Sequence, residues 1–194
     1  MVFGFTFTPY RFLEKMLLEV FSGVESALLV SLLLNALEYT VLVSLLWLGR
    51  KRGFFSSTTQ IFAFSSLLGL TMGWGKAGRD SLLVFFPSLS QCFGYSQFLI
   101  FPSHSYLLIK TLEVLFEVEV TVMVGRVLSS SLRTPLFLSI LFLFRGTVGM
   151  FQTAVQFIPP FRIFSLLYSV AFLPLLLIIG ASMLWYLRTK FVTQ

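Results

Sequence analysis

The sequence has few charged residues and little of the chemistry that binds metals or forms disulfides. Only 11% of its 194 residues are charged, whereas soluble domains carry about 25%. The single cysteine, Cys92, excludes an internal disulfide and a cysteine-built metal site. One histidine and eight acidic residues also make a metal-ligand cluster a poor expectation. The sequence therefore predicts neither a metal nor another cofactor.

The chain is instead rich in apolar residues. Hydrophobic residues make up 57% of the chain, 24 residues are Phe, and the mean hydropathy is +0.91. This balance predicts an all-α integral membrane protein, with residues 1–194 forming a single membrane domain. The net charge of +6 comes largely from Arg and Lys that flank apolar segments. That placement is typical of membrane topology, so no nucleic-acid partner is expected.

The apolar segments predict about four to five membrane helices and one helix in the membrane plane. The expected spans cover residues 26–49, 81–102, 104–143 and 163–187, and the in-plane helix covers 57–73. Segment 104–143 would measure about 60 Å as one helix, twice the hydrocarbon thickness. It is therefore expected either to tilt as one long charged helix, in a hairpin with the last span, or to break near Pro135.

Charges recur at intervals of seven within this segment, in the stretch "EVTVMVGRVLSSSLRT". Glu119, Arg126 and Arg133 would lie along one slowly drifting helical stripe, because seven residues fall about 20° short of two turns. A charge in hydrocarbon costs about 2.5–3.5 kcal/mol. We therefore expect Arg133 to face a cavity, a carboxylate of a partner or water, while Arg126 could instead extend to the membrane surface.

Three further charges, Lys110, Glu113 and Glu117, lie on a different face of the same segment. Their spacings of three and four residues allow them to pair with one another. Two interpretations stay open: a self-paired polar face against another subunit, or part of a proton path.

The stretch "EVTVMVGRVLSSSLR" resembles the fifth helix of the a subunit, the proton-channel stator subunit, of F-type ATP synthases. The pattern of that family is Glu, then Arg or Lys seven residues on, Ser at ten, Leu at thirteen and an essential Arg at fourteen. The matching residues are Glu119, Arg126, Ser129, Leu132 and Arg133.

Other segments follow the order of that family. "TTQIFAFSSLLGLTMGWGKAG" is similar to its membrane-surface helix, and "FFPSLSQCFGYSQFLIFP" to the span that follows. The sequence departs from the family at Phe137, where an Asn is usual, and near Leu175, where a Gln is usual. The 30 residues between Pro102 and Arg133 are also too few for the additional span that the family has there.

The resemblance implies a subunit that translocates protons and performs no covalent chemistry. Arg133 would be the essential arginine, facing a rotor ring of small hairpin subunits with buried carboxylates. The expected partners are that ring, other membrane subunits of the ATP synthase and lipids such as cardiolipin. The expected location is the mitochondrial inner membrane, crossed several times. The candidate residues of the proton path are Glu119, Ser129, Arg126, Glu117, Glu113, His104 and Tyr168.

Two alternatives remain open. "YLLIKTLEVLFEVEVTVM" also resembles the second helix of the smallest three-span subunit of respiratory NADH:quinone oxidoreductase, through Phe116, Glu117 and Glu119. The other alternative is a structural or lipid-binding accessory subunit of a respiratory complex, with its charges paired to neighbours. Within the stator interpretation, Arg162 is the second choice for the essential arginine.

Overall fold

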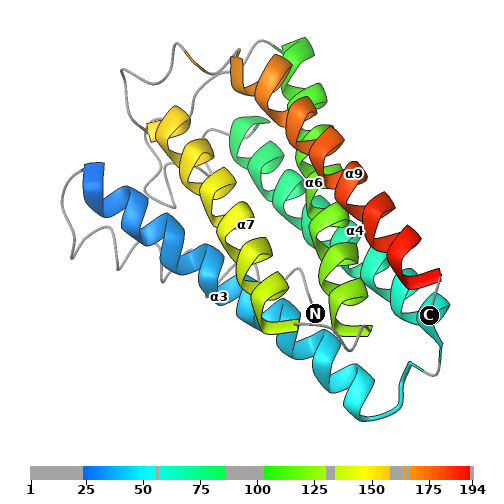
Figure 1. The fold of residues 1–194 in the computed structure, drawn as a ribbon. Helices are drawn as coiled ribbons and strands as arrows, with labels where there is room; N and C mark the ends of the chain where they lie inside the picture. The colour runs from blue at the N-terminus through cyan, green and yellow to red at the C-terminus, as the bar shows by residue number, and fades with distance from the viewer. Residues whose placement is uncertain are drawn as a thin grey trace.

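The described part of the chain is a bundle of long helices. The computed structural model describes residues 24–55, 57–85, 103–129, 134–157, 164 and 167–192. Within these ranges there is no strand, which confirms the all-α prediction (Figure 1). The elements are α3 (Val24–Lys51), α4 (Thr58–Phe85), α6 (Ser103–Ser129), α7 (Thr134–Phe157), the short π-helical η2 (Tyr168–Phe172) and α9 (Leu173–Val192).

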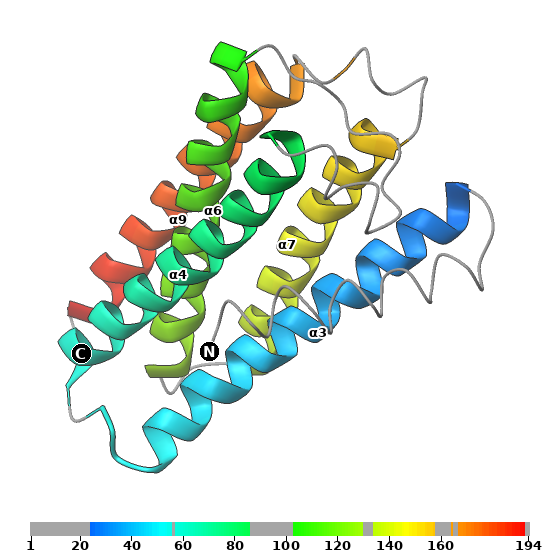
Figure 2. The same cartoon turned by 180° about the vertical axis from the view of Figure 1, so that it is seen from behind.

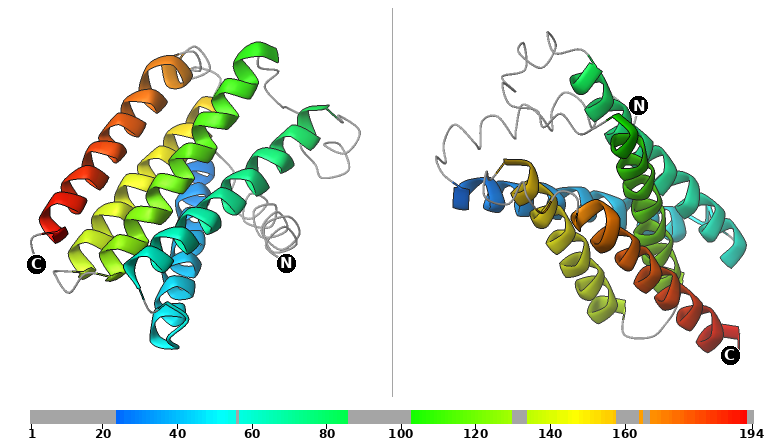
Figure 3. Two further views of the ribbon diagram at one scale, coloured as in Figure 1. Left: turned by 90° about the vertical axis from the view of Figure 1, so that its right-hand side faces the viewer. Right: turned by 90° about the horizontal axis from the view of Figure 1, so that it is seen from above.

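Helix α6 is the centre of the bundle. It packs most extensively on α4 and also contacts α9, α7 and α3. Helix α3 packs mainly on α7 and crosses the other helices obliquely (Figures 1 and 2). Seen from above, α9 and α4 flank α6, so that residues on different faces of α6 meet different helices (Figure 3, right).

Segment 104–143 is not one long helix, so that prediction is wrong. Helix α6 ends at Ser129 and α7 begins at Thr134, and the two run side by side in opposite directions (Figure 1). Pro135 stands in the first turn of α7, where its missing N–H leaves no hydrogen bond unmade. The hydroxyl of Ser129 donates to the carbonyl oxygen of Arg126 at 2.7 Å and so satisfies one carbonyl at the end of α6. The alternative of a break near Pro135 agrees with these boundaries.

Helix α4 is longer than the predicted in-plane helix over 57–73, because it continues to Phe85. It begins where the backbone N–H of Gln60 donates to the Ser57 hydroxyl, an N-terminal cap. The predicted second span, 81–102, therefore starts inside α4, and its remainder after Phe85 lies outside the described residues.

Two glycines of α4, Gly69 and Gly73, face α6. A Cβ added at Gly69 would lie 2.7 Å from Cα of Val118, and one at Gly73 would lie 2.9 Å from Cα of Val114. One turn before Gly69, Ser65 packs under Gly125 of α6. Small residues at intervals of four let two helix backbones approach closely, which is a common mode of packing between membrane helices.

The bundle has an apolar exterior and charges in its core. Exposed large apolar side chains occur on every long helix; examples are Leu33, Leu37, Leu67, Trp74, Leu115, Leu143, Ile178 and Trp185. Arg145 and Glu117, by contrast, are only 2% and 8% exposed. Soluble proteins show the reverse, because they keep Arg and Glu in water and seldom expose large apolar patches.

One helix of the described residues, Leu28–Lys51, is both long and apolar enough to cross a membrane. It coincides with the predicted first span. The described ranges also contain two apolar helical segments that are shorter, Pro135–Phe151 and Val170–Tyr186. Helix α6 is long enough but carries five charged residues. The count of four to five spans therefore stays a prediction.

Candidate functional site

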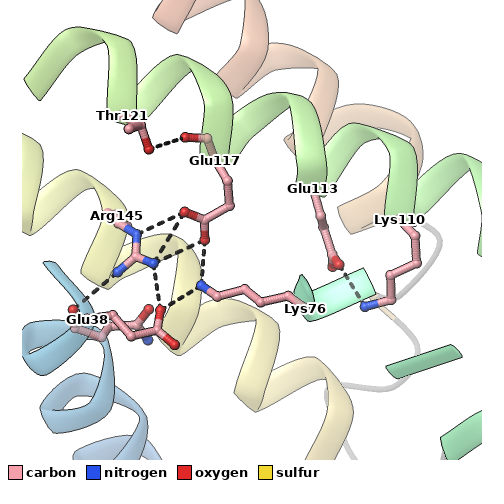
Figure 4. A network of polar contacts seen from close by, with 8 residues as sticks. Glu38, Lys76, Lys110, Glu113, Glu117, Thr121 and Arg145 are labelled. Atoms are coloured by element: carbon pink, nitrogen blue, oxygen red, sulfur yellow. Dashed lines mark hydrogen bonds and ion pairs between the residues drawn. The ribbon is translucent and has the colours of Figure 1, made fainter. Parts of the chain in front are cut away.

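Four charged side chains from four helices meet inside the bundle. They are Glu38 of α3, Lys76 of α4, Glu117 of α6 and Arg145 of α7, and they are called the ion cluster below (Figure 4). Each acidic residue contacts both basic residues, so the cluster is a closed set of two cations and two carboxylates.

Arg145 is the most deeply buried member, with 2% of its side chain exposed. Its Nη2 lies 2.6 Å from Oε2 of Glu38 and 3.1 Å from Oε1 of Glu117. Its Nε donates to Oε2 of Glu117 at 3.3 Å, and its Nη1 donates to the backbone carbonyl of Asn35 at 3.2 Å. Every nitrogen of the guanidinium therefore has an acceptor, which is what a buried arginine requires.

Lys76 closes the cluster from the α4 side. Its Nζ lies 2.6 Å from Oε2 of Glu38 and 2.6 Å from Oε1 of Glu117. The side chain of Lys76 is 22% exposed, which makes it the most accessible member of the ion cluster. The side chains of Glu38 and Glu117 are only 9% and 10% exposed. Because its charges balance, the cluster carries no net charge when all four groups are ionised.

The helices place the ion cluster at mid-height. Glu38, Glu117 and Arg145 lie near the middle of α3, α6 and α7. One turn beyond Arg145, Gly149 packs against the side chain of Asn35, so α7 approaches α3 closely at this point. On the other side, Gly69 and Gly73 allow α4 to approach α6 closely, which brings Lys76 to Glu117. Close backbone contacts on both sides therefore bring the carboxylates of Glu38 and Glu117 within ion-pair distance of the two cations.

Closer to the start of α6, Lys110 and Glu113 form the ion pair that their spacing predicts, with Nζ 2.7 Å from Oε2. The hydroxyl of Tyr168 is buried and has no hydrogen-bond partner among the described residues. Tyr168 is the first residue of η2, and η2 contacts α6, the helix that carries Glu113 and Glu117. Three of the predicted proton-path residues, Glu113, Glu117 and Tyr168, therefore lie on α6 and on the element that contacts it, with the two glutamates in separate polar contacts.

Glu119 is not part of this group. Two residues along a helix turn the side chain by about 200°, so Glu119 points away from Glu117 and toward α9. Its carboxylate packs against Gly180, and Oε2 is buried without a hydrogen-bond partner in the described part of the chain. Among the described carboxylates, Glu119 is thus the one with an oxygen that is buried and left without a partner.

The structure separates the remaining predicted residues. Arg126 and Ser129 lie in the last turn of α6, away from the ion cluster. His104 lies in the first turn of α6, and its side chain is outside the described part. Arg133 and Arg162 also lie outside the described residues. Of the stripe expected on one continuous helix, Glu119 and Arg126 lie on α6.

Three members of the ion cluster were not predicted as site residues: Glu38, Lys76 and Arg145. A signal for two of them was present, because Glu38 and Arg145 are lone charges inside apolar stretches, "NALEYTV" and "LFLFRGTV". A charge inside a membrane helix is expected to have a partner on another helix. Reading the two stretches together would have suggested the pair.

No protein-family model, curated protein or solved structure matches the chain. In the described ranges, no three His, Cys, Asp or Glu side chains are grouped so as to hold a metal ion. The fold and the site therefore define the class only as an all-α bundle whose core contains an ion cluster.

Proposed function

We propose that this chain is the stator subunit of the membrane sector of a rotary ATP synthase, in the mitochondrial inner membrane. In this proposal α3, α4, α6, α7 and α9 cross the bilayer, and the bundle faces a rotor ring of hairpin subunits with buried carboxylates. Helix α4 crosses instead of lying in the membrane plane as the sequence predicted, because it packs along α6. The chain carries no covalent chemistry. It provides a fixed positive charge and the polar groups along which protons enter and leave.

The ion cluster within an apolar exterior is the observation that carries the proposal. At a rise of 1.5 Å per residue, α3, α4, α6 and α7 measure about 36–42 Å and α9 about 30 Å, so each reaches across a hydrocarbon core of about 30 Å. Charges inside membrane bundles are costly, and they mark ion and proton pathways. The location of the ion cluster at mid-height, enclosed by other helices, supports a role in proton translocation.

The sequence pattern around α6 gives the second support. Glu119, Arg126 and Ser129 occupy α6, and Arg133 follows before α7. A positive charge close to a carboxylic acid favours its ionised form. Arg133 would therefore hold each passing rotor carboxylate ionised and would stop protons from crossing directly between the entry and exit paths.

The strength of that attraction has limits. Two unit charges 4 Å apart interact by about 4 kcal/mol at an effective dielectric of 20. A membrane potential supplies about 2.3 kcal/mol per charge per 100 mV. A dry, close ion pair would therefore stall the rotor, so we expect water at the contact between Arg133 and the ring.

In this proposal the carboxylates of α6 have different roles, which we assign from their contacts. Glu117 is held by both Lys76 and Arg145, so it stabilises the bundle and is a poor proton carrier. Glu119 has a buried oxygen without a partner in the described part, so it is free to gain and lose a proton. Glu113 is paired with Lys110, with Nζ 2.7 Å from Oε2, so it is also a poor proton carrier, and Glu119 is the carrier on α6 in this scheme.

The second candidate function is that of a structural accessory subunit, and the mutual pairing of all four charges in the ion cluster favours it. Since its two cations and two carboxylates satisfy one another, the cluster could serve only to fix the helices of an accessory subunit. The third possibility is the small membrane subunit of NADH:quinone oxidoreductase, which uses carboxylates in the region of Glu117 and Glu119.

Purification of the intact complex separates these candidates. The chain would be tagged at its C-terminus, extracted from its native membranes in a mild detergent, and its partners identified by mass spectrometry. The stator proposal expects a small carboxylate-bearing hairpin subunit in multiple copies together with a soluble ATPase head. Iron–sulfur and flavin subunits instead would support the oxidoreductase. A respiratory complex that already has its own stator subunit would support the accessory role.

A further inference from the structure

An open pocket lies where α3 and α6 end, away from the ion cluster. It has a volume of about 390 Å³ and is lined by Trp47, Arg50, Lys51 and Leu128. Arg50 and Lys51 are in the last turn of α3, and Leu128 is in the last turn of α6. The pocket therefore combines two cationic side chains with an aromatic and an aliphatic wall.

The end of α3 is arranged so that its carbonyl groups are already satisfied. Arg52, Gly53 and Phe54 donate their backbone N–H groups to the carbonyls of Leu48, Arg50 and Gly49 at 2.9–3.0 Å. Gly53 has a φ of +74°, the left-handed conformation that commonly ends a helix. Because backbone donors satisfy these carbonyls, they do not need Arg50 and Lys51 as hydrogen-bond donors, which leaves both side chains available to a ligand.

Two cationic side chains line the pocket, and the described helices around it supply no acid at this end to balance them. There is no Asp or Glu in α3 after Glu38, in α4 before Asp80, in α6 after Glu119 or anywhere in α7. In the same region Lys51 places its Nζ 5.0 Å from the centroid of the Trp47 ring, which holds the ammonium over the pocket wall. The ligand that fits this pocket is an anion.

The apolar side chains around the pocket indicate which kind of molecule the anionic group belongs to. Trp47 is half exposed, and Leu45 and Leu48, on the same end of α3, are also exposed. A tryptophan beside basic residues at a helix end is typical of the membrane–water interface. We propose that the pocket binds the phosphate of an anionic phospholipid, with Arg50 and Lys51 on the headgroup and the acyl chains along the apolar surface of α3. This inference rests on the membrane placement in the proposed function.

Lipid binding to the purified full-length chain tests the inference. Native mass spectrometry in detergent would titrate dioleoyl phosphatidylglycerol, dioleoyl phosphatidylcholine and inorganic phosphate separately. We expect one saturable phosphatidylglycerol per chain, bound at least about tenfold tighter than phosphatidylcholine, since each basic residue near an anionic lipid contributes measurably. Inorganic phosphate binding as tightly as the lipid would overturn the assignment to lipid, and equal affinity for both lipids would overturn the site.

Matched variants locate the effect. The double variant Arg50→Gln/Lys51→Gln should lose the preference for phosphatidylglycerol, whereas Arg50→Lys/Lys51→Arg, which keeps both charges, should retain it. Arg52→Gln removes an adjacent cation that does not line the pocket and should change the affinity less than about twofold. Equal losses in Arg52→Gln and the double variant would mean that net charge alone attracts the lipid.

The outcome is separable from that of the proposed function. If the chain fails to incorporate into phospholipid vesicles, the membrane placement is wrong and both proposals fall. If it incorporates and shows no preference for anionic lipid, the pocket inference alone is wrong.

Discussion

Replacing Arg145 by Gln should be among the most destabilising single changes in this protein. The substitution removes the central cation and leaves Glu38 and Glu117 facing each other, with Lys76 as their shared partner. Removing one member of a buried ion pair typically costs about 3–5 kcal/mol, because the remaining charge is left without compensation. We expect a loss of unfolding free energy in that range, measured by equilibrium unfolding in mixed detergent micelles.

A second substitution tests the reason for the loss. Adding Glu117→Gln to Arg145→Gln restores the charge balance and leaves Lys76 paired with Glu38, 2.6 Å away. The two changes should therefore be less than additive, by about 0.5–3 kcal/mol, as neighbours in one network usually are. Arg52→Gln, in the exposed turn after α3, is the matched control and should change stability by less than about 0.5 kcal/mol. Strict additivity, or an Arg145→Gln no worse than the control, would refute the account of the ion cluster.

Two further predictions concern α4 and α6. Gly69→Ala should destabilise the protein by about 1–3 kcal/mol in the same unfolding assay, since the new methyl group would meet the α6 backbone. Gly146→Ala, whose methyl group would lie 3.4 Å from the Leu32 side chain, should be neutral or stabilising; equal losses would contradict the close α4–α6 contact. Glu119→Gln should keep the thermal midpoint or raise it, because an unpartnered buried carboxylate is removed, yet reduce ATP synthesis by reconstituted complex at least about tenfold. Full synthesis in this variant would exclude Glu119 from the proton path.

The helices that were predicted well are those whose sequence is uniform. The first span, 26–49, agrees with α3 to within about two residues at each end, because an uninterrupted apolar run ends at a basic triplet. The boundary between α6 and α7 was left open, since the serines before Pro135 are compatible with either a helix or a turn. The length of α4 was missed because the segment is rich in Ser, Thr and Gly and short of Leu, so a full span was not expected there. The close contacts of Gly69 and Gly73 with the α6 backbone depend on tertiary packing that the local sequence does not show.

The ion cluster shows what a single sequence conceals. The pair Lys110 and Glu113 was predictable, because both residues lie on one helix with a spacing of three. Glu38 and Arg145 are 107 residues apart, and their meeting depends on how α3 packs on α7. Local spacing carries no information about such a pair, although the high cost of an unpaired charge in an apolar segment does indicate that each needs a partner.

Proton coupling in the reconstituted complex tests the central claim most directly. Intact complex carrying Arg133→Ala would be compared with Arg126→Ala in vesicles, with ATP synthesis and passive proton leak measured in the same preparation. If the chain is the stator, Arg133→Ala assembles normally but abolishes synthesis or leaks protons, whereas Arg126→Ala retains most of the synthesis. If Arg133→Ala synthesises ATP at the rate of the unaltered complex, Arg133 does not face the rotor and the stator proposal is wrong.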